Sequence, residues 1–353
     1  MSHLEERMEA DLNYIREWLW NIGEDVENAL RNAKKTLILM DSEVAYDIIL
    51  GDQPINRDSR QCDRLCHTFI ARYLPGAGAL REMSSTIRIN VILERIGDYA
   101  VTISREAVQL ETPLPEKFSA IIDGIADDSI EILSGARSAF REGNAERAIA
   151  LMQAAKRMEG RMDGYYDKLF AEDDRMDGAT MMIIFAVFNI FKRVADQAKN
   201  ICDQTVFAVR GVAKLPKVYR ILFLDQAGSG LGQLATAIGR SNFPDTAEFT
   251  SATPGCSQPI SDSLHDFLVE TGLPDEGLES EQLEALEYDF SDYIVIVSVN
   301  GRVSDYIKKM PFHSSALNWS LPDGQDLAGQ YRYLRSKIID LVTLLAGTET
   351  TQA

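Results

Sequence analysis

The sequence predicts a multi-domain protein, with an all-α domain over residues 1–212 followed by an α/β domain with a parallel sheet over residues 218–347. Apolar residues recur at every third or fourth position through the first part, as expected for one face of a helix. After Gly211 the pattern changes to short β-rich runs that alternate with helical stretches, which is typical of a parallel sheet. A chain of 353 residues is long enough for both domains.

Loops rich in Pro, Gly and acidic residues divide the first domain into six long helices in two sets of three. The sets correspond to repeats of about 1–112 and 113–212. Long helices joined by short loops pack as antiparallel bundles. We expect helices over residues 3–40, 43–73, 79–110, 115–142, 144–170 and 178–210.

In the second domain a glycine-rich segment, Gly228-Ser-Gly-Leu-Gly232, follows the first expected strand and opens a helix. Two short apolar runs predict buried strands at 218–224 and 293–299. The expected linker is 212–217. Helices are expected over residues 232–240, 260–272 and 325–346.

A motif written twice supports a duplication of the helical unit. Glu94-Arg-Ile-Gly-Asp98 recurs as Lys192-Arg-Val-Ala-Asp196, and the two aspartates are 196 − 98 = 98 residues apart. Residues i and i+4 of a helix share a face, so Glu94 and Asp98 point the same way. Two neighbouring carboxylates repel each other unless a cation or solvent screens them. The pair is therefore a metal-site candidate, and a solvated helix face is the alternative.

The net charge of −18 argues against nucleic acid as a partner and fits divalent cations or a basic protein surface. The N-terminus lacks the layout of a signal peptide, and the longest apolar run, 181–188, is too short to span a membrane. We expect that run to be a buried helix core, in a protein that is peripheral to a membrane at most. Four cysteines without a secretory signal indicate a cytoplasmic protein, and Cys62 and Cys66 are expected in the core.

On these motifs the region 1–212 resembles the PhoU family, regulators of phosphate uptake that accompany the bacterial ABC-type phosphate transporter. The stretch 94–101 is close to the family's E-R-I-G-D-x-A-V signature, residues 80–90 lead into it as in the family, and 193–201 matches in its Asp and Asn positions. The resemblance implies a homodimeric regulator. Its implied partners are components of the phosphate ABC transporter or a phosphate-sensing histidine kinase.

The resemblance also implies metal sites, because the family binds metal clusters through acidic pairs from helices two and three of each repeat. In the first repeat these residues are Asp52, Asn56, Glu94 and Asp98. Such oxygen ligands suit a divalent or trivalent ion, Fe, Mn, Mg or Zn, without choosing among them.

The matching set in the second repeat is Glu159, Asp163 and Asp196. There Lys192 takes the place of the acid beside Asp196. A lysine ammonium neutralises neighbouring carboxylates and displaces a cation, so we expect metal at the first site and a weaker second site.

The second domain resembles low-molecular-weight protein tyrosine phosphatases and arsenate reductases over about residues 218–345. The resemblance rests on 221–235, Ser251-Ala-Thr-Pro-Gly255, 293–297 and Asn318-Trp-Ser-Leu-Pro-Asp323. In active members the first strand runs into C-x5-R-S, in which a cysteine thiolate attacks phosphorus, backbone amides cradle the oxyanion and the arginine clamps it.

This chain departs from that pattern at the reacting positions. Asp225 stands at the nucleophile position, Leu231 at the arginine position and Gly232 at the serine position, and Asp323 matches the general acid. A carboxylate repels a phosphate dianion and Leu231 cannot bind one, so we predict a non-catalytic pseudo-phosphatase domain. Its degenerate phosphate loop comprises Asp225, Gly228, Ser229, Gly230 and Gly232, together with Asp323.

Three alternatives stay open at this point. The first is a phosphatase or arsenate reductase that uses the glycine-loop pocket, whose amides can accept an anion. A dinucleotide site is the second, although Gln233 stands where its fingerprint needs a third glycine. The third is a metal-storage or purely structural bundle.

Overall fold

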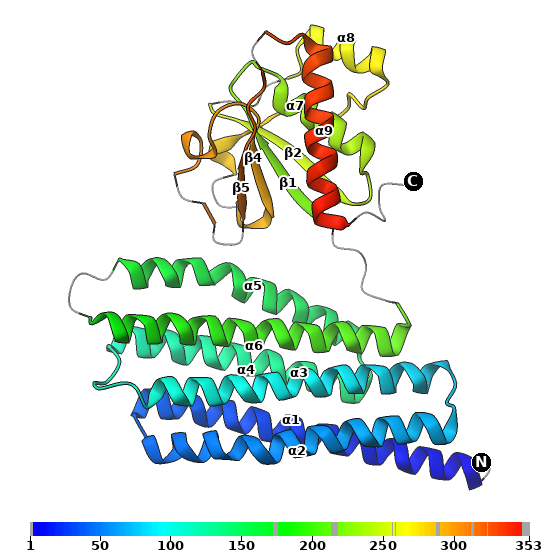
Figure 1. Ribbon diagram of the computed structural model, residues 1–353, viewed down its shortest axis with the longest axis vertical. Helices are drawn as coiled ribbons and strands as arrows, with labels where there is room; N and C mark the ends of the chain where they lie inside the picture. The colour runs from blue at the N-terminus through cyan, green and yellow to red at the C-terminus, as the bar shows by residue number, and fades with distance from the viewer. Residues whose placement is uncertain are drawn as a thin grey trace. The chain divides into compact units, whose positions relative to one another are not determined.

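The computed structural model consists of two compact units, Met1–Lys214 and Leu215–Ala353 (Figure 1). The first has one hydrophobic core, and the second has a core on each face of its sheet. The predicted fold class, six helices followed by a parallel α/β domain, is confirmed. The structure describes residues 3–171, 176–212, 218–255, 257, 259–286, 290–308, 310–311, 314–322 and 324–347, without the side chain of Ser291.

The helices of the first unit begin and end within three residues of their expected bounds, because capping residues set their ends. The side chains of Asp41, Asn144 and Asp177 each accept a hydrogen bond from a backbone N–H in the first turn of the following helix. The helices are α1 His3–Leu39, α2 Ser42–Tyr73, α3 Ala77–Ala107, α4 Glu116–Glu142, α5 Ala145–Phe170 and α6 Gly178–Arg210.

The six helices lie side by side along most of their lengths (Figure 1). Helices α1, α2 and α3 pack on one another, α4, α5 and α6 do the same, and the pairs α1–α4 and α3–α6 join the two sets. Fully buried Phe118, Phe188 and Phe191 contribute to one continuous core. Cys62 and Cys66 are buried in this core, as expected.

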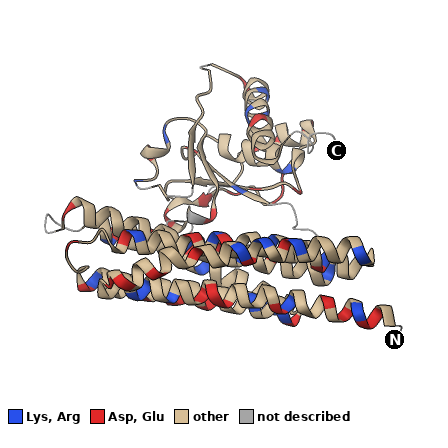
Figure 2. Ribbon diagram, turned by 60° about the horizontal axis from the view of Figure 1, so that its bottom comes forward, with Lys and Arg blue, Asp and Glu red and all other residues tan. Residues whose placement is uncertain are grey.

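Helix α6 is long and apolar enough to cross a membrane, but half of its most apolar window is buried inside the bundle. A core helix of a bundle has the same composition, and the burial agrees with that interpretation of 181–188. Charged residues of both signs are interspersed over the outer faces of the six helices (Figure 2).

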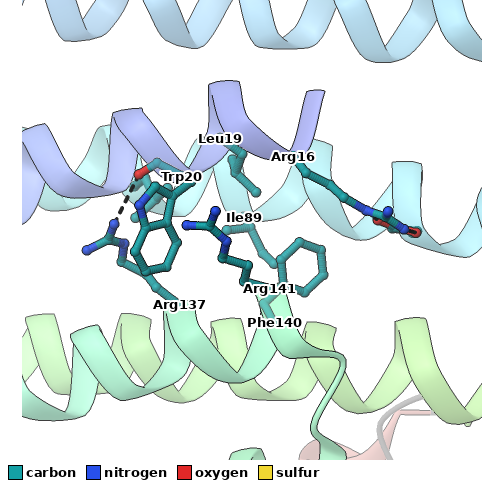
Figure 3. A pocket seen from close by; sticks show the side chains of 9 residues that line it. Arg16, Leu19, Trp20, Ile89, Arg137, Phe140 and Arg141 are labelled. Atoms are coloured by element: carbon teal, nitrogen blue, oxygen red, sulfur yellow. Dashed lines mark hydrogen bonds and ion pairs between the residues drawn. The ribbon is translucent and has the colours of Figure 1, made fainter. Parts of the chain in front are cut away.

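A buried arginine ties the two three-helix sets together. Arg137 of α4 donates from Nη1 to Glu27 Oε2 at 2.6 Å and from Nη2 to the Trp20 carbonyl at 3.0 Å, both on α1. The Trp20 ring lies between Arg137 and Arg141, each guanidinium 4.4 Å from the ring centre (Figure 3). Gly23 makes room, because a Cβ there would stand 2.2 Å from Arg137 Nε.

The second unit holds a five-stranded parallel sheet in the order β3-β2-β1-β4-β5. Strand β1 is central, and Ile221 pairs with Phe249 of β2 on one side and with Val295 of β4 on the other. The strands are β1 Tyr219–Leu224, β2 Ala247–Thr253, β3 Glu281–Gln282, β4 Val295–Ser298 and β5 Ser315–Asn318, and the helices are α7 Leu231–Asn242, α8 Asp262–Thr271 and α9 Leu327–Ala346.

Alternating side chains of β1 serve the two faces of this sheet. Ile221 and Phe223 pack in the core formed with α7, α8 and α9, whereas Leu222 and Leu224 pack against short 3-10 turns on the opposite face. Burial on both faces explains why β1 and β4 are continuous apolar runs that could be predicted from the sequence. The shorter or more polar β2, β3 and β5 were not predicted as strands.

Replacing Gly23 by Ala should lower the free energy of unfolding by about 1–3 kcal/mol, because the added methyl group displaces a guanidinium held by Glu27 and Trp20. Gly124, on α4, has no neighbour within 4 Å of such a methyl group, so Gly124→Ala should raise it by up to about 1 kcal/mol. Urea unfolding followed by helical circular dichroism would measure both, and equal effects would contradict the joint described above.

Candidate functional site

Polar side chains from α2 and α3 meet along one seam of the first repeat. Asp52 and Asn56 lie one turn apart on α2, and Glu94 and Asp98 lie one turn apart on α3. The helices come close at buried Gly97, where an added Cβ would stand 3.9 Å from Asp52 Oδ1. The structure therefore brings the four residues of the predicted first site into one neighbourhood.

Within this seam the hydrogen-bonding capacity is only partly used. Asn56 Nδ2 donates to Asp52 Oδ2 at 2.6 Å. The other side-chain oxygens of these two residues, Asp52 Oδ1 and Asn56 Oδ1, are buried and accept no hydrogen bond in the described part of the chain. A buried oxygen without a partner costs free energy, and a cation would satisfy it.

Burial and neighbouring carboxylates raise the pKa of two acids at the seam, Glu94 and Asp98. Burial raises the pKa of Glu94, and the nearby charges of Asp98 and Asp52 raise it further. Burial and then Asp52 raise the pKa of Asp98, although that side chain is largely exposed. The ionised forms of Glu94 and Asp98 are thus less favourable in the folded state than in the unfolded state. A bound cation would stabilise these ionised forms.

In this conformation no three His, Cys, Asp or Glu side chains, within the described ranges, stand close enough together to enclose a metal ion. Coordination at the seam would therefore require the carboxylates of Asp52, Glu94 and Asp98 to draw together. Oxygen donors at i and i+4 on two helices fit a hard cation in kind and number.

The seam extends beyond the predicted residues to Asn90 and Asp63. Asn90 is fully buried on α3, and its Nδ2 donates to the Ser59 carbonyl at 2.8 Å and to Asp63 Oδ1 at 2.9 Å. Its Oδ1 is a buried acceptor with no partner among the side chains and backbone described. The spacing could have identified it, because Asn90 precedes Glu94 by one helical turn.

In the second repeat a lysine occupies the equivalent seam. Lys192 Nζ lies 3.1 Å from Glu159 Oε1 on α5 and 3.2 Å from Asp196 Oδ2 on α6. Burial lowers the pKa of Lys192, but these two carboxylates outweigh it and the pKa is raised overall, so the ammonium persists. Burial, and after it the charge of nearby Asp163, raises the pKa of Tyr166 to about 12.

The loop after β1 binds an anion that belongs to the chain itself. The Asp225 carboxylate is 1% exposed and accepts hydrogen bonds from Gln226 N at 2.7 Å, from Gly232 N at 2.9 Å and from Ser229 Oγ at 2.6 and 2.7 Å. Gly228 and Gly230 have φ of 81° and 72°, which lets the loop wrap around the carboxylate. Asp323, the predicted general acid, lies outside the described residues.

This loop occupies the place where open α/β sheets usually bind ligands. The chain leaves β1 toward β2 on one side and later returns to β4 on the other, so the carboxyl ends of β1 and β4 form the switch point of the topology. The backbone N–H groups at the start of α7 suit an anion. Asp225 already fills that position, and Leu231 brings no positive charge to it.

The hollow in Figure 3 lies between the two repeats and is lined by residues of α1, α3 and α4. Its volume is about 40 Å³, which is room for a few water molecules. Arg16 binds Glu82 at 2.6 Å and Arg141 binds Glu17 at 2.6 Å. The arginines at this hollow thus already have carboxylate partners.

Comparison with known proteins identifies the helical region. Residues 19–107 match the PhoU domain family. The chain is 30% identical over 214 residues to the phosphate-specific transport system accessory protein PhoU homolog of Pseudomonas putida, which covers 59% of this chain and 83% of that protein. The chain belongs to the PhoU family.

Other PhoU proteins show the same extent of similarity. The phosphate-specific transport system accessory protein PhoU of Escherichia coli K12 is 26% identical over 213 residues, or 88% of its length. The crystal structure of PhoU from Pseudomonas aeruginosa superposes with a TM-score of 0.55 at 28% identity, over 58% of this chain and 99% of that one. These matches cover the six helices of the first unit. The α/β domain lies outside the region that they match.

Glu94→Gln should raise the Tm in EDTA at pH 7, because it removes one member of a like-charge pair. The raised pKa means that the folded state holds the proton of Glu94 more tightly than the unfolded state. The penalty is absent below the unfolded pKa and is complete once the pH has risen through the folded pKa. The gain should be about 0.2–0.5 kcal/mol at neutral pH and should vanish below about pH 4.

Thermal unfolding at several pH values would measure this gain. Glu111→Gln, in the exposed loop after α3, is the control and should leave the Tm unchanged at every pH. A gain that persists at low pH would contradict the electrostatic cause.

Asp225→Ala should create an anion site, because it frees the N–H groups of Gln226 and Gly232 for an incoming oxyanion. We expect phosphate binding in the variant by calorimetry and none in the wild type. Asp305→Ala is the control, since it removes a carboxylate that accepts from Arg302 N elsewhere in the domain. Equal phosphate binding by wild type and Asp225→Ala would show that Asp225 does not fill the cradle.

Proposed function

We propose that this chain is a cytoplasmic, non-catalytic accessory regulator of phosphate transport. The observation that carries the proposal is the similarity to PhoU, which extends over 83% of a protein named as an accessory protein of the phosphate-specific transport system. Its partners would be components of the phosphate ABC transporter or a phosphate-sensing histidine kinase. The net charge of −18 favours a docking surface that is basic, and a homodimer is the expected assembly.

A metal ion would act in the first repeat. Asp52, Asn56, Glu94 and Asp98 would hold it, and the unpartnered oxygens of Asp52 and Asn56 support this assignment. The chemistry that the ion supplies is charge neutralisation between two helices, with Fe, Mn, Mg and Zn all compatible with oxygen donors. Because α2 and α3 each bring two of these residues, their packing would then depend on the cation.

The C-terminal domain would serve as an interaction module, a pseudo-phosphatase in which chemistry has been lost. Asp225 supports this reading because a buried carboxylate held by Gln226, Ser229 and Gly232 is neither free to attack phosphorus nor compatible with a bound phosphate. Leu231 cannot clamp a transition state. Hydrolysis of p-nitrophenyl phosphate by the full chain, abolished by Asp225→Ala, would favour the competing phosphatase or arsenate reductase assignment.

Deleting the gene should change the rate of phosphate uptake at high external phosphate at least twofold, and the full-length chain should restore it. A chain with Glu94→Gln and Asp98→Asn should fail to restore it, because the seam could no longer hold a cation. Glu111→Gln should restore it fully. Radiolabelled phosphate uptake in the three complemented strains would measure these effects.

The outcomes separate the two parts of the proposal. Unchanged uptake in the deletion strain would contradict a role in phosphate transport. Full rescue by the double variant would retain that role but contradict the part assigned to the metal.

A further inference from the structure

The two repeats of the helical domain differ in the charge at one equivalent position. Glu94 of α3 and Lys192 of α6 occupy the same place in the repeated motif, one turn before Asp98 and Asp196 respectively. Arg95 and Arg193 follow them in both copies. The change from carboxylate to ammonium is therefore confined to the position that faces the neighbouring helix.

In the second repeat the ammonium bridges two helices. Lys192 Nζ is 3.1 Å from Glu159 Oε1 on α5 and 3.2 Å from Asp196 Oδ2 on α6. The Lys192 side chain is 16% exposed, whereas those of Glu159 and Asp196 are 34% and 41% exposed. The ammonium group therefore lies deeper between the helices than the two carboxylates do. This is the arrangement that a metal ion shared between α5 and α6 would have.

The first repeat has no equivalent cation among its described residues at the seam. Burial and the charges of Asp98 and Asp52 raise the pKa of Glu94, and burial and the charge of Asp52 raise the pKa of Asp98. Among the described residues, Asn56 Nδ2 donates a hydrogen bond to Asp52 Oδ2 at this seam. A divalent ion entering the second repeat would meet an ammonium already placed between its acids. The same ion entering the first repeat would meet Glu94 and Asp98, whose pKa is raised overall despite the nearby charges of Arg95 and Arg105.

We propose that Lys192 is a tethered replacement for the metal ion, so that the second repeat of this chain excludes metal and its α5–α6 pair stays closed without one. Glu159 and Asp196 are then counter-charges of a lysine and not metal ligands. This proposal rests on the proposed metal site of the first repeat. Together the two proposals give the protein one metal site, so that a cation affects the packing of α2 and α3 and not that of α5 and α6.

The test transplants the acid of the first repeat into the second. Lys192→Glu is made in the full chain in a background of Glu94→Gln and Asp98→Asn, which removes the first site. Mn²⁺ binding is measured by calorimetry and by metal content after dialysis. We expect about one equivalent of Mn²⁺ in this variant and none in the background alone.

Arg193→Glu in the same background is the matched control. It makes the same change of charge on the next residue of α6, but Arg193 is exposed and lies about 100° around the helix from Lys192. It should bind no Mn²⁺. Equal binding by the two variants would mean that added negative charge alone attracts the ion, and would overturn the proposal.

Stability supplies a second readout that does not require a new site to form. Lys192→Met in the Glu94→Gln and Asp98→Asn background removes the cation and leaves the acids, so its Tm in EDTA should fall by several degrees below that of the background protein, and millimolar Mn²⁺ should recover most of the loss. The double variant Glu94→Gln and Asp98→Asn, which retains Lys192, should show no change of Tm with Mn²⁺. An unchanged Tm for Lys192→Met, or Mn²⁺ stabilisation of the background protein, would show that Lys192 does not replace a metal.

The two proposals can fail separately. Wild-type protein that binds no Mn²⁺, beside a Lys192→Glu variant that binds one equivalent, would contradict the metal site of the first repeat and retain the role of Lys192. Wild-type protein that binds one equivalent, beside a Lys192→Glu variant that gains none, would retain the metal site of the first repeat and contradict the role of Lys192.

Discussion

A carboxylate that lies between two packed elements costs free energy unless a positive charge or N–H donors meet it, and this constraint recurs at three places in the molecule. Glu27 is matched by Arg137 at the joint of the two repeats, Glu159 and Asp196 by Lys192, and Asp225 by the backbone of its own loop. The α2–α3 seam is the place where the described residues leave this requirement least satisfied. Function is therefore best sought there.

The helices of the first domain could be predicted from the sequence to within three residues at each end, because their signals are local. A period of three to four apolar positions identified each helix, and capping residues such as Asp41 and Asp177 set the ends. In the α/β domain β1 and β4 were recognisable because both faces of each are buried. Strand β5 is four residues long, like β4, but it is mostly exposed, so its sequence lacks a continuous apolar run.

Spacing along the sequence placed residues of the candidate site on each helix, whereas their pairing across two helices was expected from the family resemblance alone. Spacing along one helix could place Glu94 beside Asp98, yet only the fold shows that Gly97 brings α3 against Asp52. Buried Asn90 escaped notice because an amide carries no charge to attract attention, although it continues the same helical face. The bond from Ser229 to Asp225 depends on loop geometry that two glycines with positive φ create, which no periodicity reports.

The carboxylate held in the loop after β1 also bears on what the C-terminal domain is able to sense. A group attached to the loop competes at a fixed effective concentration, because it never diffuses away, and a free ion has to exceed that concentration to displace it. Phosphate below that effective concentration therefore leaves the cradle formed by Gln226, Ser229 and Gly232 occupied by Asp225.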